Sequence, residues 1–140
     1  MTRSPLDLYP LSEKAPGRVR TPSGLGLEDF TVEAVLDGRI GPRDLAISPE
    51  VLRLQADIAR ESGRGKLAEN LERAAELTAV PQDMLLDTYE LLRPGRASSA
   101  RELRKRAQLM RNSFNAPLIA ALIEEAAEIG EKRGLFTRRF

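Results

Sequence analysis

The sequence predicts an all-α protein, and three features carry that prediction. From residue 48 onward, apolar residues recur mostly at spacings of three and four, the period of one face of an α-helix. Prolines and glycines interrupt this pattern briefly, as they do where one helix ends and the next begins. No run of alternating β-branched residues indicates a strand. We therefore expect a small, orthogonal bundle of several helices, preceded by an extended, proline-rich N-terminal arm.

The composition divides the chain into this arm, residues 1–26, and a helical domain, residues 27–140. The arm holds four prolines and three glycines, a density of helix breakers that excludes a regular helix. It also carries more apolar side chains than a disordered segment usually does, namely Leu6, Leu8, Tyr9, Leu11 and Val19. Two interpretations remain: a flexible tail, or, as we favour, an arm that orders when its apolar side chains dock on a neighbouring subunit.

A short helix is predicted between Leu27 and Gly38. The Thr31 hydroxyl is placed to cap its start, and Gly38 can end it in a left-handed conformation. Its apolar side is expected to comprise Val32, Val35 and Leu36. A turn at residues 41–42 and one helical turn at residues 43–46 lead to the central part of the chain.

Residues 48–93 contain three helical patterns joined by two short breaks. Ser48 suits the cap and Pro49 the first position of the first helix. The apolar side of this helix is expected to comprise Val51, Leu52, Leu54, Ile58 and Ala59. Gly63 can end it and, with Gly65, allows a tight corner. The inner face of the second helix is expected to comprise Leu67, Leu71, Ala74, Ala75 and Thr78.

The third helix opens at Pro81 and closes at Pro94-Gly95. Its inner face is expected to comprise Leu85, Tyr89 and Leu92. Ser99 and Glu102 then fit a capping box, in which the side chain of each residue accepts a hydrogen bond from the backbone N–H group of the other. The helix that follows presents an apolar face of Leu103, Ala107, Met110 and Phe114.

The last helix is expected to start at a cap formed by Asn115, with Pro117 in its first turn, and to end at Gly134. One face is expected to comprise Leu118, Leu122, Ala126 and Ile129, with Ile119 and Ile123 beside them. The tail that follows is short and basic.

Composition excludes several classes of function. The chain has no cysteine and no histidine, so it lacks thiol nucleophiles, disulfides and the commonest general base and metal ligand. Its net charge of +1 gives no bulk attraction to nucleic acid or an anionic membrane. No stretch approaches the roughly 20 apolar residues that span a bilayer. Aromatic residues make up only 4% of the chain, which indicates a thin core that an interface with a partner would complete.

Three clusters remain as candidate sites, and each has a simpler structural interpretation. The acidic set Glu69, Glu72 and Glu76 could support acid–base chemistry, but we expect a solvated face on which Glu69 pairs with Arg73. The basic run Arg101, Arg104, Lys105, Arg106 and Arg111 could contact phosphates, but no aromatic residue interleaves with it, and the acidic last helix could lie antiparallel to it. The glycines at positions 24, 26, 38 and 41 favour turns over a nucleotide-binding loop.

Three central segments carry a resemblance to a known family. LRLQADIA, LAENLERAAELTAVPQD and LLRPGR resemble the small (gamma) subunit of adenosylcobalamin-dependent diol and glycerol dehydratases. Upstream, YPLSEKAPGRVRTPSG and LEDFTVEAVLDGRIGPRDLAIS are similar to the lead-in segment of that family. From about Arg101 onward, the similarity lies in the pattern of helices and charges. The resemblance thus covers nearly the whole chain.

The resemblance implies a hydro-lyase that converts 1,2-propanediol or glycerol into the corresponding aldehyde and water. In that family a large subunit binds the substrate and a metal ion, and adenosylcobalamin lies between the large and medium subunits. The small subunit completes a dimer of heterotrimers, a heterohexamer. The resemblance therefore implies large and medium dehydratase subunits as partners, and no catalytic, cofactor-binding or metal-binding residue in this chain.

We expect a cytoplasmic protein without a nucleic-acid or membrane partner. The chain begins close to its YPL segment, which is more typical of the glycerol type, and this short N-terminus does not support association with a bacterial microcompartment. Substrate preference stays open, because the substrate pocket lies in another subunit. The alternative interpretation is a stand-alone helical adaptor or regulatory protein, which would fold cooperatively as a monomer.

Overall fold

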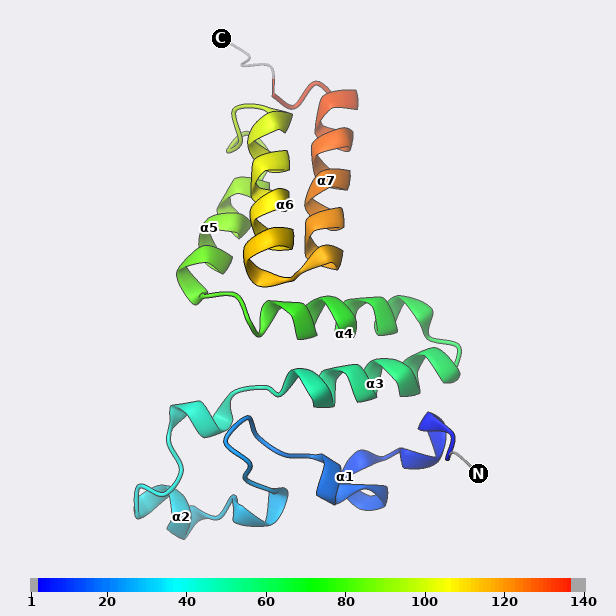
Figure 1. Ribbon diagram of the computed structural model, residues 1–140, viewed down its shortest axis with the longest axis vertical. Coiled ribbons are helices and arrows are strands. Elements are labelled where there is room, and N and C mark those ends of the chain that lie inside the picture. The colour runs from blue at the N-terminus through cyan, green and yellow to red at the C-terminus, as the bar shows by residue number, and fades with distance from the viewer. Residues whose placement is uncertain (1–2, 137–140) are drawn as a thin grey trace. The chain divides into compact units, whose positions relative to one another are not determined.

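The computed structural model describes residues 3–136, and these residues contain seven α-helices, several 3₁₀ turns and no strand (Figure 1). The predicted all-α class is therefore confirmed. Contacts between residues divide the chain into two units, Met1–Thr78 and Ala79–Phe140. The orthogonal packing of the helices and the division after residue 26 stay predictions.

The arm consists of single helical turns joined by extended residues. These turns are the 3₁₀ turns Pro5–Leu8 and Pro16–Arg18 and the four-residue helix α1, Leu11–Lys14. The expectation that the prolines and glycines of the arm exclude a helix is wrong for α1, which is a single helical turn. Pro5 and Pro16 each stand at the start of a turn, where the missing N–H group would have had no partner.

The arm packs on helix α3, Pro49–Glu61, of its own chain. Leu8 is buried against Leu54 and Ile58, and Leu11 and Ala15 pack on the same cluster. At its start, the arm donates hydrogen bonds from the Ser4 hydroxyl and the Leu6 amide to the Glu61 carboxylate. The arm is therefore ordered by contacts with α3, within the first unit of its own chain.

Between the arm and α3 lie the 3₁₀ turn Leu27–Asp29, helix α2, Val32–Leu36, and the 3₁₀ turn Pro42–Leu45. The predicted cap is confirmed, because the Ala34 amide donates to the Thr31 hydroxyl at 3.1 Å. The inward residue of α2 is Ala34, which is 1% exposed.

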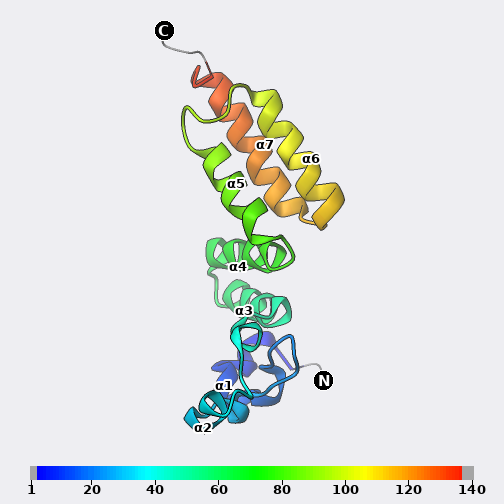
Figure 2. The ribbon, with the colours of Figure 1, turned by 90° about the vertical axis from the view of Figure 1, so that its left-hand side faces the viewer.

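Helices α3 and α4, Gly65–Leu77, form an antiparallel pair (Figures 1 and 2). Gly63 has a φ of +77°. Its amide donates to the Arg60 carbonyl at 3.1 Å, and the Arg64 amide donates to the Ala59 carbonyl at 2.8 Å. These two bonds form a Schellman motif, which closes the C-terminal end of α3 and reverses the chain.

Small residues form the contact between α3 and α4. Ala56, Ala59 and Ala68 make one buried cluster, on which Leu71 packs while remaining partly exposed. The predicted inner face of α4 needs correction, because its buried residues are Ala68 and Ala75 and Leu67 is 45% exposed. Alanine lets two helix backbones approach closely, so the bulkier leucines lie beside the contact.

The second unit contains α5, Gln82–Leu92, α6, Ala100–Phe114, and α7, Pro117–Lys132. Helices α6 and α7 form its antiparallel pair (Figure 2). The Ser99 hydroxyl caps α6 by accepting from the Glu102 amide, as predicted. The Glu102 carboxylate accepts from the Ser98 amide at 2.8 Å, one residue earlier than a capping box requires.

The turn between α6 and α7 corrects the prediction for Asn115. This residue ends α6 in the left-handed conformation, with a φ of 49°, and Ala116 precedes α7. The Ala116 amide donates to the Met110 carbonyl at 3.1 Å, which closes the C-terminal end of α6. Asparagine can serve this position because its short polar side chain tolerates the left-handed conformation better than most residues.

The core of the second unit matches the predicted face of α6 but not those of α5 and α7. Leu103, Ala107 and Met110 are buried on α6. The buried residues of α7 are Ile119, Ala120, Ile123, Ala127 and Gly130, whereas Leu118, Leu122 and Ile129 are each about 40% exposed. On α7, small residues and two isoleucines lie inside, and the leucines lie outside. On α5, Thr88 is buried and Tyr89 is 66% exposed.

Arginine side chains of α6 bind both other helices of the unit. Arg104 binds Glu131 with hydrogen bonds of 3.1 and 2.6 Å, and Arg111 binds Glu124 with hydrogen bonds of 2.8 and 2.9 Å. Arg106, which is largely buried, donates to the Thr88 hydroxyl of α5 at 2.8 Å and pairs with Asp87. Two-pronged contacts of this kind fix the register of neighbouring helices as well as attracting them.

The register of α7 can be tested with two neighbouring residues. Ile123 is fully buried, so Ile123→Ala should lower the free energy of unfolding by about 2–5 kcal/mol. Leu122→Ala removes a side chain that is 41% exposed and should cost about 1 kcal/mol or less. Urea unfolding followed by circular dichroism measures both. A larger loss for Leu122→Ala would restore the face predicted from sequence.

The two pairs between α6 and α7 should also make stability depend on pH. Hydrogen bonds from Arg111 and Arg104 lower the pKa values of Glu124 and Glu131 from the usual 4.5. A carboxyl group whose pKa is lowered by folding stabilises the folded state above its unfolded pKa, and this stabilisation disappears as the pH falls through the folded pKa.

We therefore expect the difference in Tm between the native protein and the Glu124→Gln/Glu131→Gln variant to shrink as the pH falls below about 4.5. Thermal melts followed by circular dichroism across this range measure the difference. Glu125→Gln, on the same helix but outside both pairs, serves as the control. A difference in Tm that stays constant with pH would contradict the linkage.

Candidate functional site

The acidic set on α4 takes part in surface contacts. Glu72 pairs with Arg60 of α3, and Glu69 pairs with Lys66. The predicted pair between Glu69 and Arg73 is wrong, because the Arg73 guanidinium donates to the Asn70 side chain instead. Within residues 3–136, no group of three or more acidic side chains is arranged to hold a metal ion. These contacts account for Glu69 and Glu72 as members of a salt-bridged helix face.

The basic run on α6 is largely occupied by partners inside its own unit. Arg104 and Arg111 bind carboxylates of α7, and Arg106 binds α5. The antiparallel pairing of the basic helix with the acidic one is therefore confirmed. Phosphate binding would have to compete with these intramolecular carboxylates, which disfavours a nucleic-acid site here.

The glycines at positions 24, 26, 38 and 41 form turns, two of which are closed by a nearby carboxylate. Gly24 and Gly38 have positive φ values. The Gly26 amide donates to Asp29 and the Gly41 amide to Asp44, each at 2.8 Å. In a nucleotide-binding loop such amides would point at phosphate. Here an internal carboxylate already accepts from each of them.

An exposed apolar surface covers α2 and the segment that follows it. Its members are Val32, Val35, Leu36, Leu45 and Ile47, each more than half exposed, and we call them the α2 surface. Leu36 is 80% exposed. The sequence marks Val32, Val35 and Leu36 as the apolar side of this helix, but that side does not face the core of the chain. Large apolar residues that are exposed close together mark sites of protein association.

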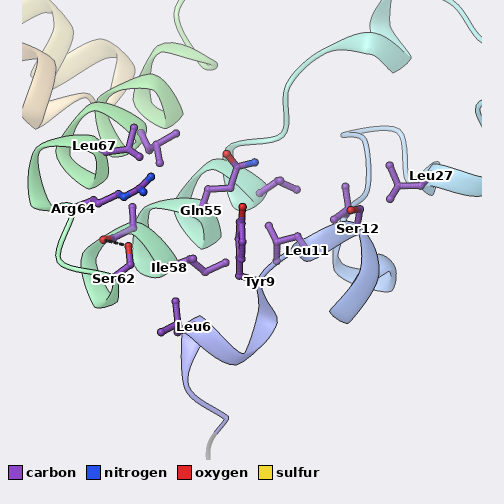
Figure 3. A pocket seen from close by; sticks show the side chains of 14 residues that line it. Leu6, Tyr9, Leu11, Ser12, Leu27, Gln55, Ile58, Ser62, Arg64 and Leu67 are labelled. Carbon is purple, nitrogen blue, oxygen red and sulfur yellow. Dashed lines mark hydrogen bonds between the residues drawn. The ribbon is translucent and has the colours of Figure 1, made fainter.

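An apolar groove lies between the arm and the α3–α4 pair (Figure 3). Its volume is about 590 Å³. The arm contributes Leu6, Tyr9, Leu11 and Ser12, and the helix pair contributes Val51, Gln55, Ile58, Arg64, Leu67 and Leu71 among others. Figure 3 shows Tyr9 and Leu11 projecting from the arm toward α3. The groove exists because the arm packs on α3 through Leu8, with Leu11 and Ala15 on the same cluster, and leaves Leu6 and Tyr9 largely uncovered.

Sequence reasoning missed this groove. It noted the apolar residues of the arm and the leucines of α4, but it placed the former on another subunit and the latter in the core. The signal that could have joined them is the combination of an aromatic-poor composition with apolar residues inside a proline-rich arm. Their convergence depends on the path of the arm across α3.

No helix within residues 3–136 has both the length and the apolar character that crossing a membrane requires. What these residues do present is apolar surface of the kind that proteins use to associate.

Comparison with known proteins fits the exposed apolar surfaces, because the similar proteins are subunits of larger enzymes. The model of the family described as dehydratase small subunit matches residues 5–137. The propanediol dehydratase small subunit of Citrobacter freundii is 47% identical over 125 residues, which cover 89% of this chain and 72% of the relative. The subunit of the same name from Salmonella typhimurium is 47% identical over 131 residues, which cover 94% and 72%. The chain therefore belongs to the dehydratase small subunit family.

Proposed function

We propose that this chain is the small, non-catalytic subunit of an adenosylcobalamin-dependent dehydratase that converts 1,2-propanediol or glycerol into an aldehyde and water. The observation that carries the proposal is the α2 surface on a member of a family of subunits. Both relatives are named for propanediol, which makes 1,2-propanediol the first substrate to test. The complex would contain large and medium subunits, as a dimer of heterotrimers in the cytoplasm, without nucleic acid or membrane.

Partner binding explains the distribution of apolar residues. About half of the buried core residues are alanines, whereas the larger side chains of Val32, Leu36 and Ile47 lie outside the core. Burying an exposed leucine or valine side chain is worth about 1.5–3 kcal/mol, so covering the α2 surface would contribute to assembly. A stand-alone adaptor, the alternative, would leave this surface in water.

The residues of this chain do not fit adenosylcobalamin itself. The chain has no histidine, the common protein ligand of cobalt. The lining of its groove is mostly aliphatic and carries one charged residue, Arg64. A corrin with many amide side chains and a phosphate needs many hydrogen-bonding partners. In this proposal the other subunits hold the cofactor, which supplies the radical chemistry, and this chain holds the assembly together.

The first prediction concerns assembly. Co-expression with large and medium subunits should yield one complex that contains this chain in equal copy number. The double variant Val32→Ser/Leu36→Ser should keep its own Tm, because both side chains are more than 70% exposed, and should dissociate from the complex more readily. Size-exclusion chromatography with light scattering measures both properties. Recovery of this chain as a free monomer beside a fully active two-subunit enzyme would refute the proposed function.

The second prediction concerns catalysis. Alanine substitutions at Glu69, Glu72, Arg73, Glu76 and Tyr89 should leave the turnover of the assembled enzyme within a few-fold of the native value. Removing a true general acid or base typically lowers the rate by about 10²–10⁴-fold. The measurement is turnover of each purified complex with saturating adenosylcobalamin. A hundredfold fall at intact stoichiometry would place this chain in the active site.

A further inference from the structure

We propose that the groove between the arm and the α3–α4 pair receives a segment of a partner dehydratase subunit, and that Arg64 pairs with a carboxylate on that segment. The inference rests on the proposed function, because it names the surface through which the small subunit meets its partner. The segment would carry large apolar side chains for the groove and one aspartate or glutamate for Arg64.

The walls of the groove define the apolar part of this occupant. Tyr9 is 66% exposed, and Leu6 and Leu67 are 44% and 45% exposed. They surround a hollow of about 590 Å³, which is large enough for several side chains. An apolar hollow of this size, rimmed by exposed apolar residues, is typical of a surface that another molecule covers.

Arg64 defines the charge of the occupant. It is the only charged residue that lines the groove within residues 3–136. The neighbouring cations have carboxylate partners, since Arg60 pairs with Glu72 and Lys66 with Glu69. The Arg64 side chain forms no hydrogen bond or ion pair with any residue between positions 3 and 136. Covering the groove would remove water from the guanidinium, which is costly unless a carboxylate arrives with the occupant.

The position of Arg64 strengthens this argument. It is the N-cap residue of α4, where the helix dipole favours negative charge and disfavours a cation. The first turn of α4 contains no acidic residue that would balance it. Arg64 therefore does not stabilise its own helix, whereas a carboxylate from a partner would be attracted by both Arg64 and the helix end. The hydrogen bond from its amide to the Ala59 carbonyl holds its backbone beside the groove.

Two polar side chains in the lining favour a polypeptide over a lipid chain. Ser12 of the arm and Gln55 of α3 contribute a hydroxyl and an amide to a mostly apolar surface, whose Ser62 hydroxyl already donates to the Ala59 carbonyl (Figure 3). Such groups can satisfy the backbone N–H and C=O groups of a segment that enters the groove. A hydrocarbon chain would leave them without partners.

The first test uses the absence of cysteine from the chain. Leu67→Cys places a thiol in the groove, and Lys66→Cys places one next to it on a side chain position that is 93% exposed. In the assembled complex, the thiol of Leu67→Cys should react with a maleimide at least about tenfold more slowly than that of Lys66→Cys. Both should react at similar rates after denaturation in urea. Equal rates in the native complex would overturn the proposal.

The second test reverses the charge. Arg64→Glu should raise the Kd for the large–medium subunit pair by about 30-fold or more, while Arg64→Lys should stay within about threefold of the native value. The variant Arg64→Glu should fold, because it puts an acidic residue at a helix N-terminus. Arg101→Glu, a change of the same charge at an exposed site in the second unit, is the control. Native affinity for Arg64→Glu, or an equal loss for Arg101→Glu, would refute the role of Arg64.

The third test identifies the occupant. The photo-crosslinker p-benzoylphenylalanine at position 9 keeps an aromatic ring in the groove. Mass spectrometry of the irradiated complex should recover a cross-linked partner peptide that contains apolar residues and an aspartate or glutamate. Cross-linking to a fatty acid or to a second copy of this chain, whose α2 carries both apolar and acidic residues, would overturn the assignment.

These tests separate the groove from the proposed function. If the native chain fails to bind the large and medium subunits at all, the proposed function is wrong. If the native chain binds but the groove variants bind equally well and react equally with maleimide, only the groove assignment is wrong.

Discussion

The close approach of paired helices through small residues is the constraint on which the rest of the structure depends. Ala56, Ala59 and Ala68 bring α3 and α4 together, and Ala120, Ala127 and Gly130 lie on the buried face of α7. Small residues let helix backbones approach closely, but they bury little area. Each unit therefore gains precise geometry from its helix pair and only modest hydrophobic stabilisation.

The small residues at these helix contacts explain where several larger apolar side chains lie. With alanine at the contacts, leucines such as Leu67 and Leu122 lie beside the contact and remain more than 40% exposed. The α2 surface follows the same rule, since Ala34 is the inward residue and its apolar neighbours face water. A subunit that stays bound to its partners can leave such surface exposed in the free chain, because the surface is buried in the complex.

Charge pairs complement the small cores. Arg104 and Arg111 tie α6 to α7, and the pair of Arg60 with Glu72 ties α3 to α4. These arginines contact the neighbouring helix beside its apolar contact, so they set register more than they add free energy at a solvated surface. Arg64 at the groove, for which residues 3–136 provide no ion-pair partner, differs from the arginines that serve the fold.

The sequence by itself determined the helices, most of their ends and the family. Helical spacing of apolar residues, the cap at Thr31 and the stops at Gly63 and Gly134 depend on local backbone chemistry, which a few neighbouring residues fix. Tertiary structure alone decided which apolar residues are buried. Leucine and alanine both suit an apolar face, and only the distance between paired backbones selects Ala68 over Leu67, or Ile123 over Leu122. The groove likewise arises only when the arm packs on α3, a contact between residues more than forty positions apart, such as Leu8 and Leu54, that no local pattern encodes.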